Sequence, residues 1–468
     1  MADEREPVEV TAAVGDEELV AGTLWVHDRQ GQSATFRYDQ TYLSHPLAYE
    51  LDPTLPLGAG VIQTRPGKEM FNAFSDSAPD RWGQNLMRRQ ERNRAAAAGT
   101  RPRTLTGADF LLGAHDELRQ GGIRFRRPDT TDYWSPAQHG VPRLVSLPRL
   151  LDASDRLSGD DVDTQAIRDL VNAGSSLGGA RPKASVLTNR GELAIAKLPH
   201  SGGDQWDVPG WEKLEADLAF RTGINTASSE LVQVRGGNVL ISHRFDREGR
   251  HRVGFASALT MLEASDGDRR SYLEIAEVAE VHSPQAEADL AELYRRVVFS
   301  AMTANTDDHL RNHGFLRTNN GWRLAPAYDL NPNPDNPGQL TTAIDLDDAT
   351  CNVDLVLSVA GYFRLSDDDA KQIVTEVETA TRDWRSHAHA LGLAGVEVAR
   401  MEQAFDNRFR SEACRLGHTV IPKPSQPPPA GRTAGGEQPR LTDGRFTYKR
   451  SGEITGIELA RPAPGLST

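Results

Sequence analysis

The spacing of apolar side chains changes once along this chain, and this change limits its fold more than any other feature. Up to about residue 248, several segments alternate apolar and polar side chains as strands do, including 8–38, 184–198 and 230–245. From residue 270 onward helical spacing dominates, for example in Leu-Tyr-Arg-Arg-Val-Val-Phe-Ser-Ala-Met-Thr-Ala at 293–304. A strand-rich lobe followed by a helix-rich lobe predicts an α+β fold with a cleft between the lobes.

Shifts in composition divide the chain into three parts. Residues 126–145 are polar and contain three prolines, so we interpret them as the link out of a first domain. We therefore predict a β-rich N-terminal domain at 1–130 and a second region at 145–420, in which the strand-rich lobe ends at about residue 248. The remaining residues, 421–468, are predicted to be a Pro/Gly-rich tail that contains a last strand pair within 441–460.

The bulk composition excludes several classes of protein. The 468 residues carry a formal net charge of −13, so the surface as a whole is not that of a nucleic-acid-coating protein. The acidic N-terminus lacks the pattern of a secretory signal, and no apolar stretch is long enough to span a bilayer. The two cysteines, Cys351 and Cys414, do not form a C-x-x-C pair. We therefore expect a cytoplasmic protein without a membrane contact.

One segment concentrates polar side chains between apolar runs: Asn-Thr-Asp-Asp-His-Leu-Arg-Asn-His-Gly-Phe, residues 305–315. His309 and His313 would share one face if the segment were helical, which raises the alternative of a metal-dependent hydrolase. However, the residue after His309 is Leu, so the H-E-x-x-H pattern fails. The spacing from Asp307 to Asn312 instead matches the catalytic loop of kinases, where the Asp orients the substrate hydroxyl and the Asn reaches Mg²⁺.

Other residues would complete a kinase site. Asp329 follows a predicted hairpin in Leu-Ala-Pro-Ala-Tyr-Asp-Leu, where its carboxylate could bind the metal. Lys197 lies near the end of a predicted strand and could reach nucleotide phosphates, with Glu212 or Glu215 on the following helix as its acidic partner. Each residue alone has an ordinary structural explanation, such as a turn or a solvent-facing side chain. Their occurrence in the order found in kinases favours phosphoryl transfer.

A glycine-rich loop lies directly before a predicted strand. Its sequence, at 174–183, is Gly-Ser-Ser-Leu-Gly-Gly-Ala-Arg-Pro-Lys. Glycines allow backbone N–H groups to approach phosphate oxygens closely. The Walker pattern is not met, so a P-loop NTPase is disfavoured. Most such glycine and serine clusters are turns, and the loop alone therefore does not assign a nucleotide site.

In combination these motifs resemble the HipA-type toxin serine/threonine kinases. The resemblance covers roughly residues 1–420. The segments that carry it are Ser-Ser-Leu-Gly-Gly-Ala-Arg-Pro-Lys-Ala-Ser-Val (175–186), Ile-Ala-Lys-Leu-Pro (195–199), His-Arg-Phe-Asp-Arg (243–247), the polar segment at 305–315, Leu-Ala-Pro-Ala-Tyr-Asp-Leu (324–330), and, near the N-terminus, Phe-Ser-Asp-Ser-Ala-Pro-Asp-Arg-Trp-Gly (74–83) and Gly-Gly-Ile-Arg-Phe (121–125).

The resemblance implies a bilobal protein-kinase-like fold of the HipA type behind an extra N-terminal β-rich domain, with ATP and Mg²⁺ as cofactors. It implies that Asp307 is the catalytic base and that Asn312 and Asp329 bind the metal. Ser176 matches the family's site of autophosphorylation. The residues that the resemblance places around ATP are Gly178, Gly179, Ala180, Arg181, Pro182, Lys183, Lys197, the hinge residues His243, Arg244 and Phe245, and His309, Leu310, Arg311, Asn312, Tyr328 and Asp329. At His243 the family commonly has Glu.

The resemblance also implies partners. One is a HipB-like helix-turn-helix antitoxin dimer that binds operator DNA, so DNA contact by this chain is expected to be mainly indirect. The other is a protein substrate, an aminoacyl-tRNA synthetase similar to glutamyl-tRNA synthetase, whose phosphorylation arrests growth and leads to persistence. An alternative from another class is a catalytically weak nucleotide binder that acts as a co-repressor scaffold with the antitoxin.

Overall fold

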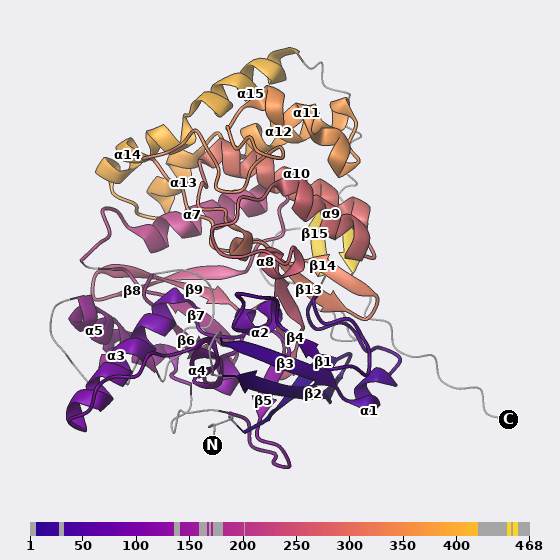
Figure 1. Cartoon of the computed structure of the whole chain (residues 1–468). Helices are drawn as coiled ribbons and strands as arrows, with labels where there is room; N and C mark the ends of the chain where they lie inside the picture. Colours follow the sequence, from indigo (N-terminus) through magenta and orange to yellow (C-terminus); the bar gives the residue numbers. More distant parts are fainter. Residues whose placement is uncertain are drawn as a thin grey trace.

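The computed structural model describes residues 6–27, 32–134, 141–158, 166–167, 170–171, 181–200, 202–419, 447–450 and 453–456. It has both sheets and helices, and the α+β class predicted above is confirmed. The N-terminal sheet lies at one end of the molecule and the helix-rich part at the other, as Figure 1 shows in indigo and orange. A second sheet and helix α7 (Val208–Arg221) lie between them (Figure 1).

The N-terminal sheet has the strand order β4-β3-β2-β1-β5, and every neighbouring pair in it is antiparallel. Strands β1 and β2 form a hairpin in which Val14 pairs with Glu17, and Gly15 in its turn has φ +59°, a backbone conformation that glycine adopts without strain. The sequence prediction of a small antiparallel sheet over 8–38 is therefore confirmed. The elements of this part are β1 (Val8–Val14), β2 (Glu17–His27), β3 (Ser33–Tyr38), α1 (Gln40–Leu43), β4 (Ile62–Gln63), α2 (Asn72–Asp76), α3 (Arg81–Ala97), α4 (Gly107–Leu112), the 3₁₀ helix η1 (Asp116–Leu118) and β5 (Ile123–Arg126).

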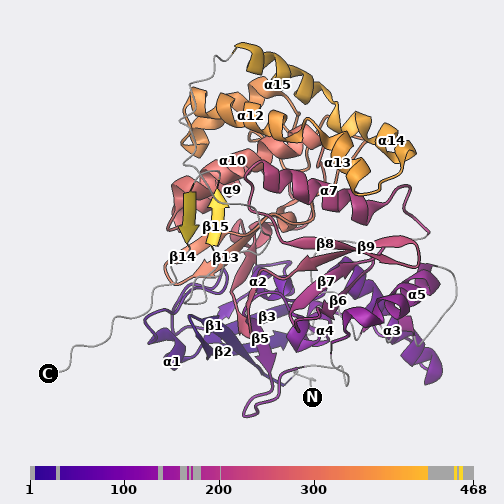
Figure 2. The same cartoon turned by 180° about the vertical axis from the view of Figure 1, so that it is seen from behind.

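The second sheet has four antiparallel strands in the order β6-β7-β9-β8, so β7 is an inner strand. In the hairpin between β8 and β9, Arg235 and Gly236 both have positive φ, which matches the twist of the flanking strands. Figure 2 shows α7 running along this sheet, with α3 and α5 near β6. The elements of this part are η2 (Leu144–Ser146), α5 (Leu147–Ser158), β6 (Lys183–Leu187), β7 (Leu193–Lys197), α7 (Val208–Arg221), β8 (Ser229–Val234) and β9 (Gly237–His243).

Helices dominate the rest of the described chain, as predicted from the helical spacing after residue 270. A three-stranded sheet, β12-β13-β14, interrupts them. The predicted hairpin joins β13 to β14, but its turn residues are Asn319 and Asn320 and not Asn320 and Gly321, because Gly321 already pairs with Thr318. The elements are β10 (Arg247–Glu248), β11 (His251–Arg252), β12 (Phe255–Ser257), α8 (Ala258–Met261), α9 (Tyr272–His282), α10 (Ala286–Thr303), η3 (Leu310–Asn312), β13 (Gly314–Thr318), β14 (Gly321–Leu324), α11 (Val353–Ser358), η4 (Ala360–Phe363), α12 (Asp367–Thr381), α13 (Trp384–Ala390), α14 (Gly395–Phe405) and α15 (Arg408–Thr419).

Two strands lie within the predicted tail. Strand β15 (Thr447–Arg450) pairs with β16 (Glu453–Gly456) in antiparallel fashion, which agrees with the strand pair expected within 441–460. Among the residues that the structure describes, no helix is both long enough and apolar enough to cross a membrane.

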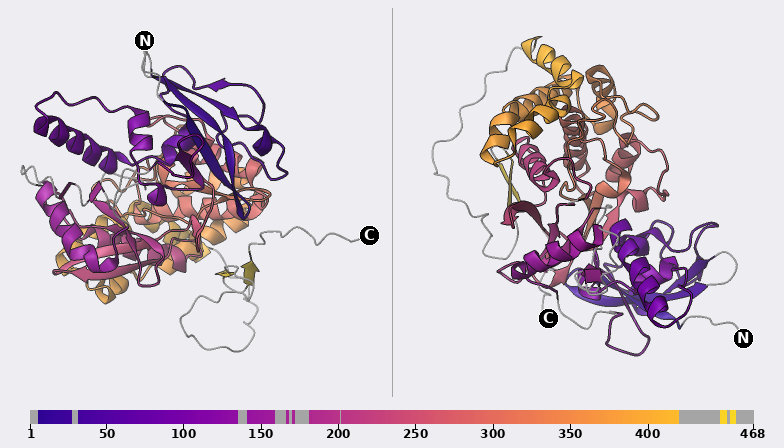
Figure 3. Two further views of the ribbon diagram at one scale, coloured as in Figure 1. Left: turned by 90° about the horizontal axis from the view of Figure 1, so that it is seen from below. Right: turned by 90° about the vertical axis from the view of Figure 1, so that its left-hand side faces the viewer.

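Within the described part of the chain, buried apolar side chains form two clusters, and these do not follow the predicted domain boundary. The larger cluster joins the N-terminal sheet to α7 and to the helices after residue 258. The smaller cluster joins β6, β7 and β9 to α5 and to Trp82 and Leu86 of α3. In the right-hand view of Figure 3 the orange helices lie at the top and the indigo and purple N-terminal part at the bottom. Packing therefore splits the N-terminal region between the two cores.

Candidate active site

Lys197 ends the inner strand β7, and its ammonium group lies between two carboxylates. Its Nζ is 2.5 Å from Oδ1 of Asp329 and also donates a hydrogen bond to Oε1 of Glu212. Only 16 % of the Lys197 side chain is exposed, so the three charges share a largely dry environment. Strand β7, helix α7 and the segment after β14 thus meet at one point.

These charges shift one another's pKa values. Burial disfavours the charged ammonium, but the carboxylates of Asp329 and Glu212 outweigh it and raise the pKa of Lys197. Burial alone would raise the pKa of Asp329, yet the ammonium groups of Lys197 and Lys183 lower it to about 2. Burial also raises the pKa of Glu212, with Lys197 acting against it. At neutral pH the site therefore contains a charged lysine beside an ionised Asp329.

Helix α7 determines which glutamate reaches Lys197. The helix begins after Asp207, whose side chain accepts the N–H of Gly210 at 3.1 Å, and Trp211 is fully buried against the helical part. Glu212 therefore faces the strand, whereas Glu215, one turn later, is completely buried and its pKa is raised by burial. Of the two glutamates that the sequence left open, Glu212 is the partner of Lys197.

Backbone hydrogen bonds hold Asp329 in place. Ala327 donates its N–H to the carbonyl of Asn225 at 2.7 Å, and its own carbonyl accepts the N–H of Ala227 at 2.9 Å. Two residues later Asp329 has φ +58°, a left-handed conformation that aspartate tolerates better than most residues. The N–H of Asn331 then bonds Oδ1 of Asn305 at 2.9 Å, which ties the segment after Asp329 to the polar loop.

The polar loop begins where α10 ends, at Ala304 in a left-handed conformation, and it continues into η3 and β13. Asp307 is exposed, and Asn312 donates its amide N–H to the backbone carbonyl of Asp307 at 2.8 Å. Partial desolvation and the carboxylate of Asp329 raise the pKa of Asp307, against the effect of His309. The loop thus brings Asp307 within the electrostatic range of Asp329.

Asp308, next to Asp307, points into the protein. Its carboxylate accepts the N–H of Thr341 at 2.7 Å, the N–H of Thr342 at 3.2 Å and the hydroxyl of Tyr272 at 2.7 Å. Its carbonyl accepts the hydroxyl of Thr342 at 2.6 Å. Burial nevertheless raises the pKa of Asp308 to about 7. One aspartate of the pair is therefore exposed toward the site and the other anchors the loop.

The two histidines do not share a helix face. Between them lies only the three-residue 3₁₀ helix η3, and His313 already has an extended backbone. Because a carbonyl can only accept, the 3.1 Å contact from His313 Nε2 to the carbonyl of Asp308 requires a proton on Nε2. The premise of the zinc-hydrolase alternative is thus wrong, and among the described residues no group of three His, Cys, Asp or Glu side chains could hold a metal.

The residues predicted to bind Mg²⁺ have suitable donor atoms. Oδ1 of Asn312 is buried and has no hydrogen-bond partner, and the same holds for Oδ1 of Asn331. Asn331 also donates from its amide nitrogen to Oδ1 of Asp329 at 3.4 Å. Mg²⁺ prefers oxygen ligands and commonly uses one or two carboxylates together with substrate phosphates. Asp329 and Asn312 therefore fit the ion, and Asn331 is a third oxygen donor that the sequence reasoning missed.

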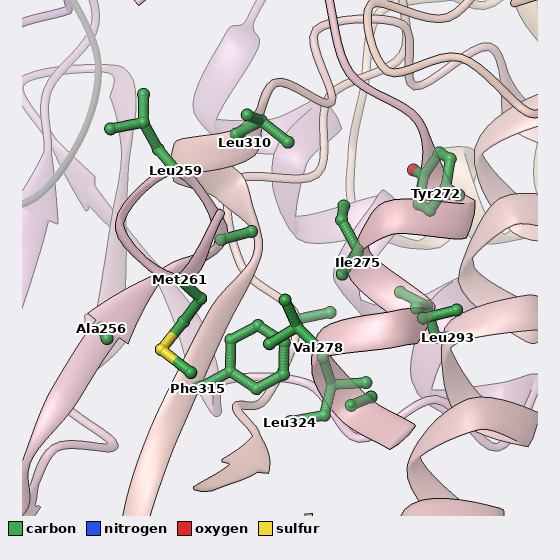
Figure 4. Close-up of a cluster of buried hydrophobic side chains, with 14 of the residues drawn as sticks. Ala256, Leu259, Met261, Tyr272, Ile275, Val278, Leu293, Leu310, Phe315 and Leu324 are labelled. Atoms are coloured by element: carbon green, nitrogen blue, oxygen red, sulfur yellow. The ribbon is translucent and has the colours of Figure 1, made fainter. Parts of the chain in front are cut away.

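Several residues assigned to ATP by resemblance have side chains engaged elsewhere. Leu310 packs into the apolar core near Leu259, as Figure 4 shows. Arg311 pairs with Asp266 at 2.8 Å, and Arg181 pairs with Asp204. Contacts from Leu310 or Arg311 to a nucleotide would therefore come from the backbone. Gly178, Gly179, Ala180 and the predicted phosphorylation site Ser176 lie outside the described residues, and Pro182 is buried before β6.

The predicted hinge begins at His243, the last residue of β9, and continues through Arg244 and Phe245. The backbone N–H of His243 donates to the carbonyl of Ser228 at 2.8 Å, and that of Arg244 donates to the carbonyl of Leu193 at 3.3 Å. Two of the three hinge N–H groups are thus used within the protein. The Phe245 ring lies 5.4 Å from the ring of Tyr328, whose hydroxyl donates to the carbonyl of Arg311 at 2.6 Å. Tyr328 hence links the hinge to the polar loop.

The sequence matches two family models, and the fold is similar to that of a solved structure. A family model of the HipA N-terminal domain matches residues 13–105, and a model of the HipA-like C-terminal domain matches residues 175–384. The fold is similar to that of HipA in the complex of the Shewanella oneidensis MR-1 toxin–antitoxin system with HipB and operator DNA, with a TM-score of 0.62 and 16 % identity over 88 % of this chain and 100 % of that one. This likeness confirms the predicted HipA-type fold.

Two curated proteins of Sinorhizobium fredii are also similar in sequence. "Putative kinase Y4dM" is 33 % identical over 128 residues, which is 26 % of this chain and 29 % of that protein. "Putative kinase Y4mE" is 28 % identical over 178 residues, which is 33 % of this chain and 41 % of that protein. The matched segments thus span less than half of either relative. The two family models together match well over half of this chain, which therefore belongs to the HipA family.

Proposed function

We propose that this protein is an ATP-dependent serine/threonine protein kinase. The observation that carries the proposal is the position of Lys197 between Glu212 on a helix and Asp329 on the loop after a hairpin. Protein kinases need this arrangement, because the lysine holds the nucleotide phosphates, the glutamate orients the lysine and the aspartate binds the metal. The names of the two curated relatives support the same reaction class.

The proposed reaction moves the γ-phosphoryl group of ATP to a serine or threonine hydroxyl. Asp307 is exposed, so its carboxylate can accept the hydroxyl proton while the hydroxyl oxygen bonds to phosphorus and ADP leaves. Lys197 binds phosphate oxygens and stabilises their charge. Mg²⁺, when bound, neutralises further phosphate charge. Asp329 and Asn312 would hold this ion, with Asn331 close to Asp329.

We further propose that the kinase is the toxin of a type II toxin–antitoxin system. The related HipA from Shewanella was solved with HipB and operator DNA, which supports a HipB-like partner for this chain. We propose that this partner is a helix-turn-helix dimer and that the chain contacts DNA mainly through it. The proposed substrate is an aminoacyl-tRNA synthetase similar to glutamyl-tRNA synthetase, and its phosphorylation would arrest growth. Ser176 is the proposed site of autophosphorylation, where about two added negative charges would repel the ATP phosphates.

The decisive experiment follows ³²P from ATP into purified glutamyl-tRNA synthetase and into fractionated lysate, with mass spectrometry of each labelled band. Asp307→Asn should abolish transfer but retain ATP binding in calorimetry. Asp368→Asn, a change at an exposed aspartate of α12, is the matched control and should transfer normally. Undiminished transfer by Asp307→Asn would refute the role of Asp307, and ATP binding without any transfer by the wild type would favour the co-repressor scaffold.

A further inference from the structure

Three segments of the proposed nucleotide site carry cations that the resemblance assigned to ATP, yet each cation contacts the N-terminal region instead. The first is Lys183, at the end of the glycine-rich loop. Its Nζ lies 3.0 Å from Oδ2 of Asp80, and each of the two side chains is only 4 % exposed. Asp80 is also the N-cap of α3, where it accepts the N–H of Gly83 at 2.8 Å. Helix α3 thus holds the start of β6.

The second segment is the hinge. Arg244 donates to the carbonyl of Leu118 at 3.1 Å and to that of Arg119 at 2.9 Å. It also forms a two-pronged pair with Asp246, whose Oδ2 accepts the N–H of Gly121 at 2.6 Å. Gly121 has φ +76°, and a Cβ there would approach the backbone N and the Cβ of Phe255 to 3.1 Å. The loop 118–121 therefore fits closely behind the hinge.

The third segment is the polar loop. Nη1 of Arg311 lies 3.3 Å from Oδ1 of Asp76, which belongs to α2. Asp76 also accepts the N–H of Ser257 at 2.8 Å and the hydroxyl of Thr260 at 2.7 Å. Because these three groups converge on one buried carboxylate, α2, α8 and the polar loop are held in a single arrangement.

We propose that the N-terminal region is a built-in positioning element of the nucleotide site, in which Asp80, the loop 118–121 and Asp76 hold Lys183 at the start of β6, the hinge and the polar loop respectively. This inference rests on the proposed kinase function for its link to ATP. The contacts themselves do not depend on it, since they join residues of the protein to one another. Asp76 and Asp80 are positioning residues and do not touch the substrate.

Asp80→Asn tests the proposal without destroying the helix, because Asn caps a helix about as well as Asp but carries no charge to form an ion pair with Lys183. Asp39→Asn, at the N-cap of α1, is the matched control. We expect hydrogen exchange to increase in 181–187 for Asp80→Asn and in 309–313 for Asp76→Asn, with no change for Asp39→Asn. The KM for ATP should rise about tenfold in both site variants, as for the loss of one charge-assisted contact, with kcat nearly unchanged.

The outcomes separate the two proposals. If the wild type binds no ATP in calorimetry, the kinase proposal fails. The hydrogen-exchange experiment still tests whether Asp80 and Asp76 hold the segments that they contact. If exchange and KM in Asp80→Asn match those of Asp39→Asn, the positioning role is overturned. Should Asp76→Asn fail to fold, Arg311→Gln removes the same contact from the side of the polar loop. Exchange that increases evenly over the whole chain would indicate general destabilisation and would also overturn the proposal.

Discussion

The ammonium group of Lys197 forms ion pairs with two carboxylates. Its removal would therefore leave Glu212 and Asp329 close together without that counter-charge. We expect Lys197→Met to lower the free energy of unfolding by about 3–5 kcal/mol near neutral pH, as for other broken buried pairs. In the variant both carboxyl pKa values in the folded state would rise above those in the unfolded state. The folded protein would then bind more protons, and the loss should be smaller at pH 5 than at pH 8.

Urea denaturation at the two pH values measures this difference. Lys213→Met is the control, since Lys213 pairs with Asp217 within α7 and its removal brings no two carboxylates together. An equal loss of stability for Lys197→Met at pH 5 and pH 8 would show that Glu212 and Asp329 do not interact through Lys197.

The His313 side chain contacts the backbone carbonyl of Asp308. The two side chains should nevertheless change the free energy of unfolding in opposite directions as the pH rises. The pKa of Asp308 is raised from 3.8 to about 7 by burial, so its contribution to stability is lost as the pH rises through that range. The pKa of His313 is lowered from 6.5 to about 3 by burial, so its contribution is lost as the pH falls through that range. Between about pH 4 and 6.5 the two effects therefore oppose each other.

Single substitutions should expose the two effects. In Asp308→Asn the free energy of unfolding should increase more steeply from pH 4.5 to 6.5 than in the wild type, because only the histidine effect remains. In His313→Gln it should increase less steeply, or decrease. Thermal or urea unfolding at three pH values within this window provides the slopes, and wild-type slopes in both variants would rule out the assigned titrations.

At the scale of elements, α7 is fastened to the helical part of the molecule. Glu397 of α14 accepts the indole N–H of Trp211 at 2.8 Å and the N–H of Asp207 at 3.2 Å. The Trp211 ring lies 6.3 Å from Trp384 and 6.1 Å from Phe405. The helix that carries Glu212 is thus held against α13 and α14.

Glu397→Ala should therefore reduce the free energy of unfolding by about 1–3 kcal/mol, because it leaves a buried indole N–H without an acceptor. It should also weaken ATP binding, since Glu212 moves with α7. Glu402→Ala, on the same helix, removes an exposed pair with Arg385 and should cost less than about 1 kcal/mol. Calorimetric ATP affinities and urea midpoints of the two variants test the difference. Equal effects would mean that α7 is not held through Glu397.

The elements differ in how well the sequence predicts them. The hairpins were predictable because glycine marks their turns, as Gly236 does with its positive φ between β8 and β9. Gly321 marked the hairpin of β13 and β14, but it pairs with Thr318 and the turn lies one residue earlier. The sequence also suggested which residues form one candidate site, because they occur in the order found in kinases: Lys197, Asp307, Asn312 and Asp329. The contact of Asp76 with Arg311 was not predictable, because 235 positions separate the two residues and no local pattern marks them. The core position of Leu310, inside the polar motif, was not predictable either, because no local pattern distinguishes it from its polar neighbours.

At the scale of the whole molecule, we expect the two apolar cores of the described residues to define its cooperative units better than the domain boundary near residue 130 does. The larger core contains the N-terminal sheet together with α9 and α10, while the smaller one contains β6, β7, β9, α5 and part of α3. Side chains within one core lose their packing together when it opens, so partial unfolding should follow the cores.

Native-state hydrogen exchange under mild denaturant tests this prediction. Amides of β1 and β2 should exchange with the same opening free energy as those of α10, because one core buries all three elements. Amides of β6, β7 and the start of α3 should form a second group, since they pack in the smaller core. Leu86→Ala should promote exchange in the second group and leave the first unchanged, because it opens a cavity only in the smaller core. If residues 6–126 instead opened together, α3 included, the N-terminal region would be an independent unit, and its contacts with the nucleotide site would break whenever it opened.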